Sequence, residues 1–120
     1  MPGPIKSPLG SHIIVEFYSC DPAILNDADL IKTFMETAAI KANATVVSSH
    51  FHQFSPQGIS GVIIIAESHL TIHTWPEQAY AAVDIFTCGA SLKPHEAVDY
   101  LKTAMGCGQV SVVELKRGYV

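Results

Sequence analysis

Hydrophobic and polar residues recur along the chain with two different periods, and the change of period separates strands from helices. Residues 12–19 alternate between apolar and polar positions, which is the spacing of a β-strand. Over residues 26–43 the apolar positions instead return every three or four residues, as on one face of an amphipathic helix. Asn26 or Asp27 is placed to cap the start of this helix, because both side chains accept hydrogen bonds from free backbone N–H groups.

Alternation returns after the first helix and predicts a series of short strands. We expect these strands at residues 45–54, 59–66, 70–74, 80–88 and 109–116. A second helix is expected to begin at Pro94 and to end at Gly106. The predicted order β-α-β-β-β-β-α-β indicates an α+β fold, a two-layer α/β sandwich whose mainly antiparallel sheet carries two helices on one face.

Length and composition fit one globular domain and argue against several functions. A chain of 120 residues with 48% hydrophobic residues can form a single core, and residues 1–11 read as a loose N-terminal tail without the apolar stretch of a signal peptide. The net charge of −4 and seven scattered Lys and Arg residues give no basic surface for nucleic acid. The longest apolar run, residues 62–66, is far too short to cross a membrane.

The cysteines and histidines predict neither a disulfide framework nor a metal site. Three cysteines at unrelated spacings indicate free thiols in a reducing cytoplasm, and Cys20 and Cys107 are expected in the core. His50 and His52 share one side of a strand, but the sequence assigns them no role. His69 and His73 are four residues apart, a spacing that would align them only on a helix, and the segment looks extended.

The segment AESHLTIHTWPE, residues 66–77, places reactive side chains directly after a buried strand. Ser68 and His73 are five residues apart and face opposite sides of a regular strand, so a hydrolytic pair would need a break in the chain. Trp75 is either a packing residue or a stacking platform for a flat ligand. Phe54 is by default a core residue, and Glu77 is a carboxylate able to accept hydrogen bonds from hydroxyls.

Two motifs taken together resemble one enzyme family. ESHLTIHTWPE at residues 67–77 and AAVDIFTCG at 81–89 are similar to segments of the prokaryotic S-adenosylmethionine decarboxylases, which depend on a pyruvoyl group. The resemblance extends over about residues 12–116. It implies that the chain cuts itself between Glu67 and Ser68, giving chains 1–67 and 68–120, and that Ser68 becomes the pyruvoyl cofactor without metal or pyridoxal phosphate.

The resemblance also implies a role for each remaining residue of the motifs. Ser60 corresponds to a residue that stabilises the oxyanion of the acyl shift, and His73 to the one that removes the Cα proton of Ser68. Cys88 corresponds to the catalytic proton donor, a role that suits a thiol titrating near pH 8.5. Substrate contacts are implied for three residues: Phe54 and Trp75 would stack on adenine, and Glu77 would bind the ribose hydroxyls.

The family's reaction sets the expected function. S-adenosylmethionine would bind through its amine to the pyruvoyl carbonyl as an imine, lose CO2 and become the aminopropyl donor for spermidine biosynthesis. The family also implies a homodimer of processed units with active sites near the interface. Two alternatives stay open at this point: an arginine decarboxylase on the same scaffold, and a binding module that is never processed.

Overall fold

The computed structural model describes residues 7–89 and 91–120. Most of the predicted tail, residues 1–6, lies outside the described residues. The first strand begins at Gly10, two residues earlier than its alternation predicts. No helix in the described part of the chain is long and apolar enough to span a membrane.

The observed elements follow the predicted order. They are β1 (Gly10–Tyr18), α1 (Pro22–Leu25), α2 (Ala28–Lys41), β2 (Val46–Gln53), β3 (Ile59–Ile65), β4 (Ser68–Trp75), the 3₁₀ turn η1 (Pro76–Gln78), β5 (Tyr80–Thr87), α3 (Pro94–Ala104) and β6 (Gln109–Arg117). The prediction missed α1 and η1 because three or four residues are too few to show a period. It also made β4 too short, since this strand already begins at Ser68.

Local capping explains where the helices begin and end. The Asp27 carboxylate accepts a hydrogen bond from the N–H of Leu30 at 3.0 Å, which identifies Asp27 as the N-cap of α2. Asp21 caps α1 in the same way, with Pro22 in the first helical position. Gly106, with φ of +64°, follows the last turn of α3 and lets the chain reverse toward β6.

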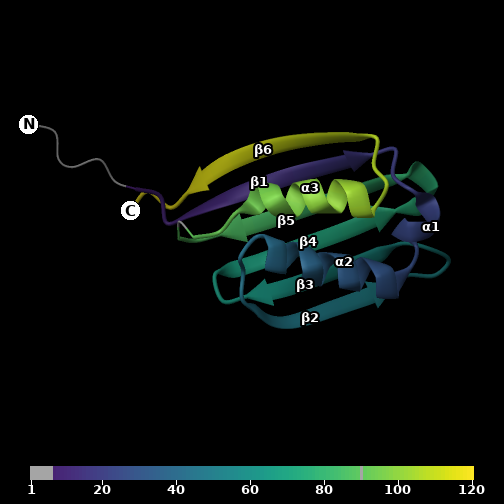
Figure 1. The fold of residues 1–120 in the computed structure, drawn as a ribbon, viewed down its shortest axis with the longest axis horizontal. Coiled ribbons are helices and arrows are strands. Elements are labelled where there is room, and N and C mark those ends of the chain that lie inside the picture. The colour runs from purple at the N-terminus through teal and green to yellow at the C-terminus, as the bar shows by residue number, and fades with distance from the viewer. Residues whose placement is uncertain (1–6, 90) are drawn as a thin grey trace, which may run out of the picture.

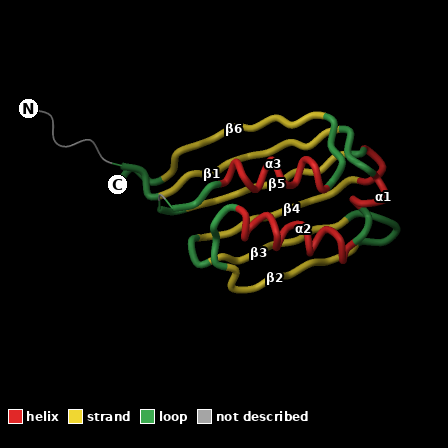
Figure 2. The backbone as a smooth tube through the Cα atoms, viewed as in Figure 1, coloured by secondary structure: helices red, strands yellow, loops and turns green. Residues whose placement is uncertain are grey.

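The fold is the expected two-layer sandwich. Six antiparallel strands form one sheet in the order β2-β3-β4-β5-β1-β6. Helices α2 and α3 lie side by side on the same face of this sheet, as Figures 1 and 2 show. The prediction of an α+β sandwich with both helices on one face is confirmed.

The alternation of β4 decides which side chains reach the core. Leu70, Ile72 and Thr74 are buried beneath the helices, so the side chains between them point to the opposite face. The buried hydroxyl of Thr74 has two hydrogen-bond partners: it donates to the carbonyl of Leu25 at 2.8 Å and accepts from the N–H of Ile59 at 3.0 Å. The core thereby holds β4 in one register and presents His69 and His73 outward.

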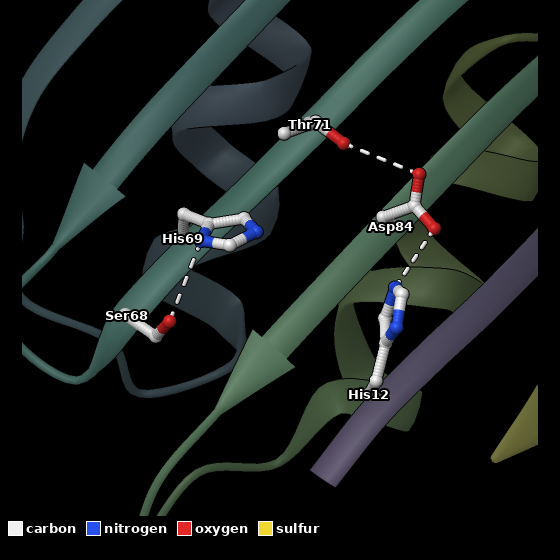
Figure 3. A network of polar contacts seen from close by, with 5 residues as sticks. All are labelled: His12, Ser68, His69, Thr71 and Asp84. Carbon is white, nitrogen blue, oxygen red and sulfur yellow. Dashed lines mark hydrogen bonds and ion pairs between the residues drawn. The ribbon is translucent and has the colours of Figure 1, made fainter. Parts of the chain in front are cut away.

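The opposite face of the sheet, called the open face below, carries both polar and apolar side chains. In its middle, Asp84 pairs with His12 at 2.9 Å and accepts a hydrogen bond from Thr71 at 3.3 Å (Figure 3). Apolar residues flank this network, with Ile64 42% and Val113 52% exposed. Within the described residues no helix packs on this face, although both helices pack on the other.

Candidate active site

The turn between β3 and β4 holds Ser68 in a strained backbone conformation. Ile65 pairs with Ser68 across the turn, which leaves only Ala66 and Glu67 between the two strands. The φ of Ser68 is +152°, a region that side-chain-bearing residues rarely adopt. Such a conformation costs about 1–3 kcal/mol and is concentrated at functional sites. The strained residue is therefore the one that directly follows the Glu67–Ser68 peptide bond.

The carbonyl oxygen of Glu67 accepts two hydrogen bonds from Cys88. The N–H of Cys88 donates at 3.1 Å and its thiol at 2.6 Å. Two donors aimed at one carbonyl oxygen polarise it and stabilise the negative charge that develops when a nucleophile attacks the carbon. Cys88 is exposed, unlike the buried pair Cys20 and Cys107. We call Glu67, Ser68 and Cys88 the turn cluster.

Two further contacts anchor the turn cluster to the rest of the sheet. The side chain of Glu67 accepts a hydrogen bond from the N–H of Thr45 at 3.1 Å. The N–H of Ala66 donates to the carbonyl of Thr45 at 2.9 Å. Thr45 immediately precedes β2, so the turn is held from one side by β2 and from the other by Cys88 at the end of β5.

A second group of predicted site residues lies at the other end of the open face. A cavity of about 330 Å³ is lined by residues from the β2–β3 loop, β3, β4 and η1, among them Phe54, Ser60, His73, Trp75 and Glu77. We call these five residues the aromatic cluster. Phe54 and Trp75 are 49% and 43% exposed, so the alternative of core packing is wrong for both. Exposed rings beside a carboxylate suit a flat ligand that carries hydroxyl groups.

Ser60 and His73 are partners of each other. They pair across β3 and β4, and the hydroxyl of Ser60 lies 2.8 Å from Nδ1 of His73. The ring of His73 is also 6.3 Å from that of Trp75. Neither Ser60 nor His73 therefore sits against Ser68 of its own chain.

The structure separates the residues that the motif places together. β4 runs without a break from Ser68 to Trp75, and five residues of strand between Ser68 and His73 span about 17 Å. A hydrolytic Ser68–His73 pair within one chain is excluded by this distance. The predicted residues thus form two clusters at opposite ends of the open face.

Sequence reasoning assigned no role to the histidine next to the reactive serine. Nδ1 of His69 lies 3.4 Å from Oγ of Ser68, and the ring of His69 stacks on Phe86 at 5.8 Å (Figure 3). The available signal was direct adjacency in the motif Glu-Ser-His. The spacing of His69 and His73 points instead to a pair of metal ligands, which the extended strand does not align.

The other cysteines and histidines lie outside both clusters. Cys20 and Cys107 are buried as predicted, with sulfur atoms 2.6 Å apart, and the hydrogen bond with Cys20 together with burial raises the pKa of Cys107. His52 packs its ring edge against Phe54 at 4.6 Å, while His50 is exposed. Among the residues that the structure describes, no three His, Cys, Asp or Glu side chains are grouped to hold a metal ion.

Comparison with known proteins agrees with the motifs and the fold. The family model for S-adenosylmethionine decarboxylase matches residues 11–118. The S-adenosylmethionine decarboxylase proenzymes of Acidithiobacillus ferrooxidans and Thermodesulfovibrio yellowstonii are 55% and 54% identical, over 93% of this chain and 84% and 83% of their own lengths.

Solved structures show the same fold. The crystal structure of adenosylmethionine decarboxylase from Aquifex aeolicus superposes with a TM-score of 0.87 at 39% identity, covering 95% of this chain and 94% of that one. A Trypanosoma brucei AdoMetDC monomer shares the fold alone, with a TM-score of 0.65 at 15% identity over 87% of this chain and 45% of its own. The match of the family model, the identity of the relatives and the shared fold show that this chain belongs to the S-adenosylmethionine decarboxylase family.

Proposed function

We propose that this chain is the proenzyme of a self-processing decarboxylase that acts on S-adenosylmethionine. The observation that carries the proposal is the double hydrogen bond from Cys88 to the carbonyl oxygen of Glu67, next to the strained Ser68. That geometry activates one particular peptide bond in the chain. A binding module that is never processed does not require an activated peptide bond.

Processing converts an amide into an ester and then removes the serine. Oγ of Ser68 attacks the carbonyl carbon of Glu67, and the C–N bond breaks, so that Glu67 is joined to Ser68 through oxygen. Loss of the Cα proton then expels the Glu67 carboxylate and leaves a dehydroalanine at residue 68. Hydrolysis of this residue releases ammonia and leaves a pyruvoyl group at the start of the 53-residue chain 68–120.

The residues around Ser68 fit a pyruvoyl group made in place. The turn cluster holds the serine from which the group is made, and Cys88 lies beside it with an exposed thiol. The pyruvoyl carbonyl supplies the electron sink that amino-acid decarboxylation requires. Cys88 is then placed to return a proton to the carbon that has lost CO2.

The aromatic cluster suits the nucleoside part of S-adenosylmethionine. Trp75 and Phe54 are exposed on the cavity wall and can stack on a purine, and their faces attract a sulfonium cation. Glu77 on the same wall can accept hydrogen bonds from the ribose hydroxyls. The names of the similar enzymes likewise favour S-adenosylmethionine over arginine.

A homodimer brings the two clusters together. One chain keeps them about 17 Å apart on the open face, so a complete site needs a second copy. If two open faces pack together about a two-fold axis that crosses the strands, each turn cluster meets the partner's aromatic cluster. Such packing also covers the exposed apolar side chains Ile64, Val113 and Leu115.

Mixed dimers test this arrangement directly. Ser68→Ala and His73→Ala variants are each expected to be inactive alone. When they are co-expressed with different tags, the mixed dimer has one site with Ser68 from one chain and His73 from the other. Random pairing should restore about one active site in four overall, which is one in two among the mixed dimers. Decarboxylation measured on dimers purified through both tags checks this expectation, and an absence of activity there would place each site within a single chain.

Substrate contacts can be separated from chemistry by mutation. Trp75→Ala removes a stacking surface worth about 0.5–1.5 kcal/mol, which corresponds to a roughly 2- to 13-fold higher KM. Self-cleavage should be unaffected, because no step of the processing chemistry uses the Trp75 ring. Steady-state kinetics together with fragment analysis measures both quantities on one sample. An unchanged KM for S-adenosylmethionine would remove Trp75 from the binding site.

The proposed function is tested on the fresh wild-type protein. Denaturing mass spectrometry should show fragments of 67 and 53 residues, with the second fragment lacking an amino-terminal amine. Release of labelled CO2 from S-adenosylmethionine, and not from arginine, should accompany the cleaved form. A chain that stays intact after long incubation contradicts the proposal.

The proposed place in metabolism follows from the product. Decarboxylated S-adenosylmethionine carries an aminopropyl group, which suits the synthesis of spermidine. The three cysteines are free thiols in the structure, so we place the enzyme in the reducing cytoplasm.

A further inference from the structure

His69 is the basic side chain that the structure places against the reactive hydroxyl. Its Nδ1 lies 3.4 Å from Oγ of Ser68, at the long end of hydrogen-bonding distance (Figure 3). Catalytic contacts of this kind are often long at rest and shorten as the reaction proceeds. Figure 3 shows the Ser68 hydroxyl and the His69 ring turned toward each other on adjacent residues of β4.

The ring of His69 is held in place by its neighbour on β5. His69 pairs with Phe86, and the two rings are stacked at 5.8 Å with an angle of 19° between their planes. The guanidinium of Arg117 lies 5.8 Å from the centre of the Phe86 ring, and His12 lies 6.0 Å from it. The stacking limits rotation of the imidazole and keeps Nδ1 directed toward Ser68.

We infer that His69 is the general base of the first processing step, the transfer of the Glu67 acyl group from nitrogen to oxygen. The inference rests on the proposed self-processing. Nδ1 of His69 takes the proton from Oγ of Ser68 while Oγ bonds to the carbonyl carbon of Glu67. The same imidazole then gives the proton to the amide nitrogen of Ser68 as the C–N bond breaks. No proton is gained or lost overall, and no other reactant is needed.

This role divides the processing chemistry among three side chains. Cys88 stabilises the charge on the Glu67 oxygen, and His69 moves the proton between two atoms of Ser68. His73 of the same chain lies about 17 Å from Ser68. In the proposed dimer, the partner's His73 is the residue that removes the Cα proton of Ser68 in the later step. The transfer requires the His69 tautomer that carries its proton on Nε2, which leaves Nδ1 able to accept.

The two steps can be distinguished by the form of protein that accumulates. Before the acyl shift, Glu67 and Ser68 are joined by an ordinary amide bond, which hydroxylamine leaves intact. After the shift it is an ester, which hydroxylamine cuts into fragments of 67 and 53 residues, the second beginning with an unmodified serine. The sequence has no Asn–Gly bond, so the usual side reaction of hydroxylamine with proteins is absent.

The test follows self-cleavage of freshly purified His69→Gln protein by mass spectrometry, with and without hydroxylamine. We expect cleavage to slow by about 10²- to 10⁴-fold, the usual contribution of a general base. The uncut protein should resist hydroxylamine. His50→Gln, which changes an exposed histidine on β2, is the matched control and should cleave like the wild type.

A second variant separates chemistry from packing. His69→Ala opens space beside Phe86, and added imidazole is expected to restore part of its cleavage rate, which a purely structural defect would not allow. Unchanged cleavage in His69→Gln overturns the inference while leaving the self-processing of the wild type in place. An ester that accumulates and is cut by hydroxylamine also overturns it, because His69 would then act after the shift. Failure of the wild type itself to cleave counts against the proposed function instead.

Discussion

Ser68→Ala is expected to leave the 120-residue chain uncut and without measurable decarboxylation of S-adenosylmethionine. Alanine has no hydroxyl to attack the carbonyl of Glu67, so neither the ester nor the pyruvoyl group can form. The electron sink is then missing, and turnover should fall by on the order of 10⁶-fold or more, toward the uncatalysed rate. Mass spectrometry of the intact chain and release of labelled CO2 measure the two losses on one preparation.

Ser68→Ala is expected to abolish activity but to change the stability of the fold very little. Within the described residues the side chain of Ser68 bonds to no other element of the fold, because its hydroxyl lies near His69 on the same strand. We therefore expect the variant to unfold at nearly the same temperature as the uncut wild type. Ser91→Ala, at an exposed loop position, is the matched control and should cleave and turn over normally. Two fragments from Ser68→Ala would show that the cut is adventitious proteolysis.

The elements of the fold could be predicted because each strand has one face in the core. The alternation over residues 12–19 matches buried Ile13, Val15 and Phe17, and the three- to four-residue period of α2 matches buried Ile31 and Met35. Period alone predicts the order of the elements and places both helices on one face. It does not predict which strands are neighbours, and β1 in fact lies between β5 and β6.

The division of the site into two clusters could not be predicted from spacing. The motif of residues 67–77 is continuous in sequence, but β4 is extended, so Ser68 and His73 are about 17 Å apart. The contact between Cys88 and the Glu67 carbonyl joins residues 21 positions apart. That contact depends on the register in which Ser68 pairs with Thr87. Register is set by the whole core, which no short motif contains.

The exposure of the aromatic residues could not be predicted from residue type, for a related reason. Residue type alone favours the core for Phe54 and leaves Trp75 between packing and stacking on a ligand, because large aromatic side chains are usually buried. Trp75 instead falls on the side of β4 that faces away from the helices, and Phe54 lies just beyond the end of β2. Both are exposed in a single chain. An exposed aromatic residue on a sheet face without helices indicates a ligand or a partner subunit.

Substitution of Cys88 should separate the two roles proposed for its side chain. In Cys88→Ala the backbone N–H still donates to the Glu67 oxygen, but the thiol donor at 2.6 Å is lost. Removing one such donor costs about 10²- to 10³-fold in rate, so the variant should cleave slowly but completely on long incubation. Once cleaved, it lacks the proton donor for the substrate carbon and should turn over about 10²- to 10⁴-fold more slowly.

Cys88→Ser distinguishes hydrogen bonding from proton donation. A serine hydroxyl can still donate to the oxygen of Glu67, so self-cleavage should return close to the wild-type rate. The hydroxyl is a far weaker acid than a thiol, which titrates near pH 8.5, so decarboxylation should stay as low as in Cys88→Ala. Cleavage half-times and kcat of the processed protein give the two measurements. If Cys88→Ser turned over at the wild-type rate, the proton would have to come from another group, and Cys88 would keep only its role at the Glu67 carbonyl.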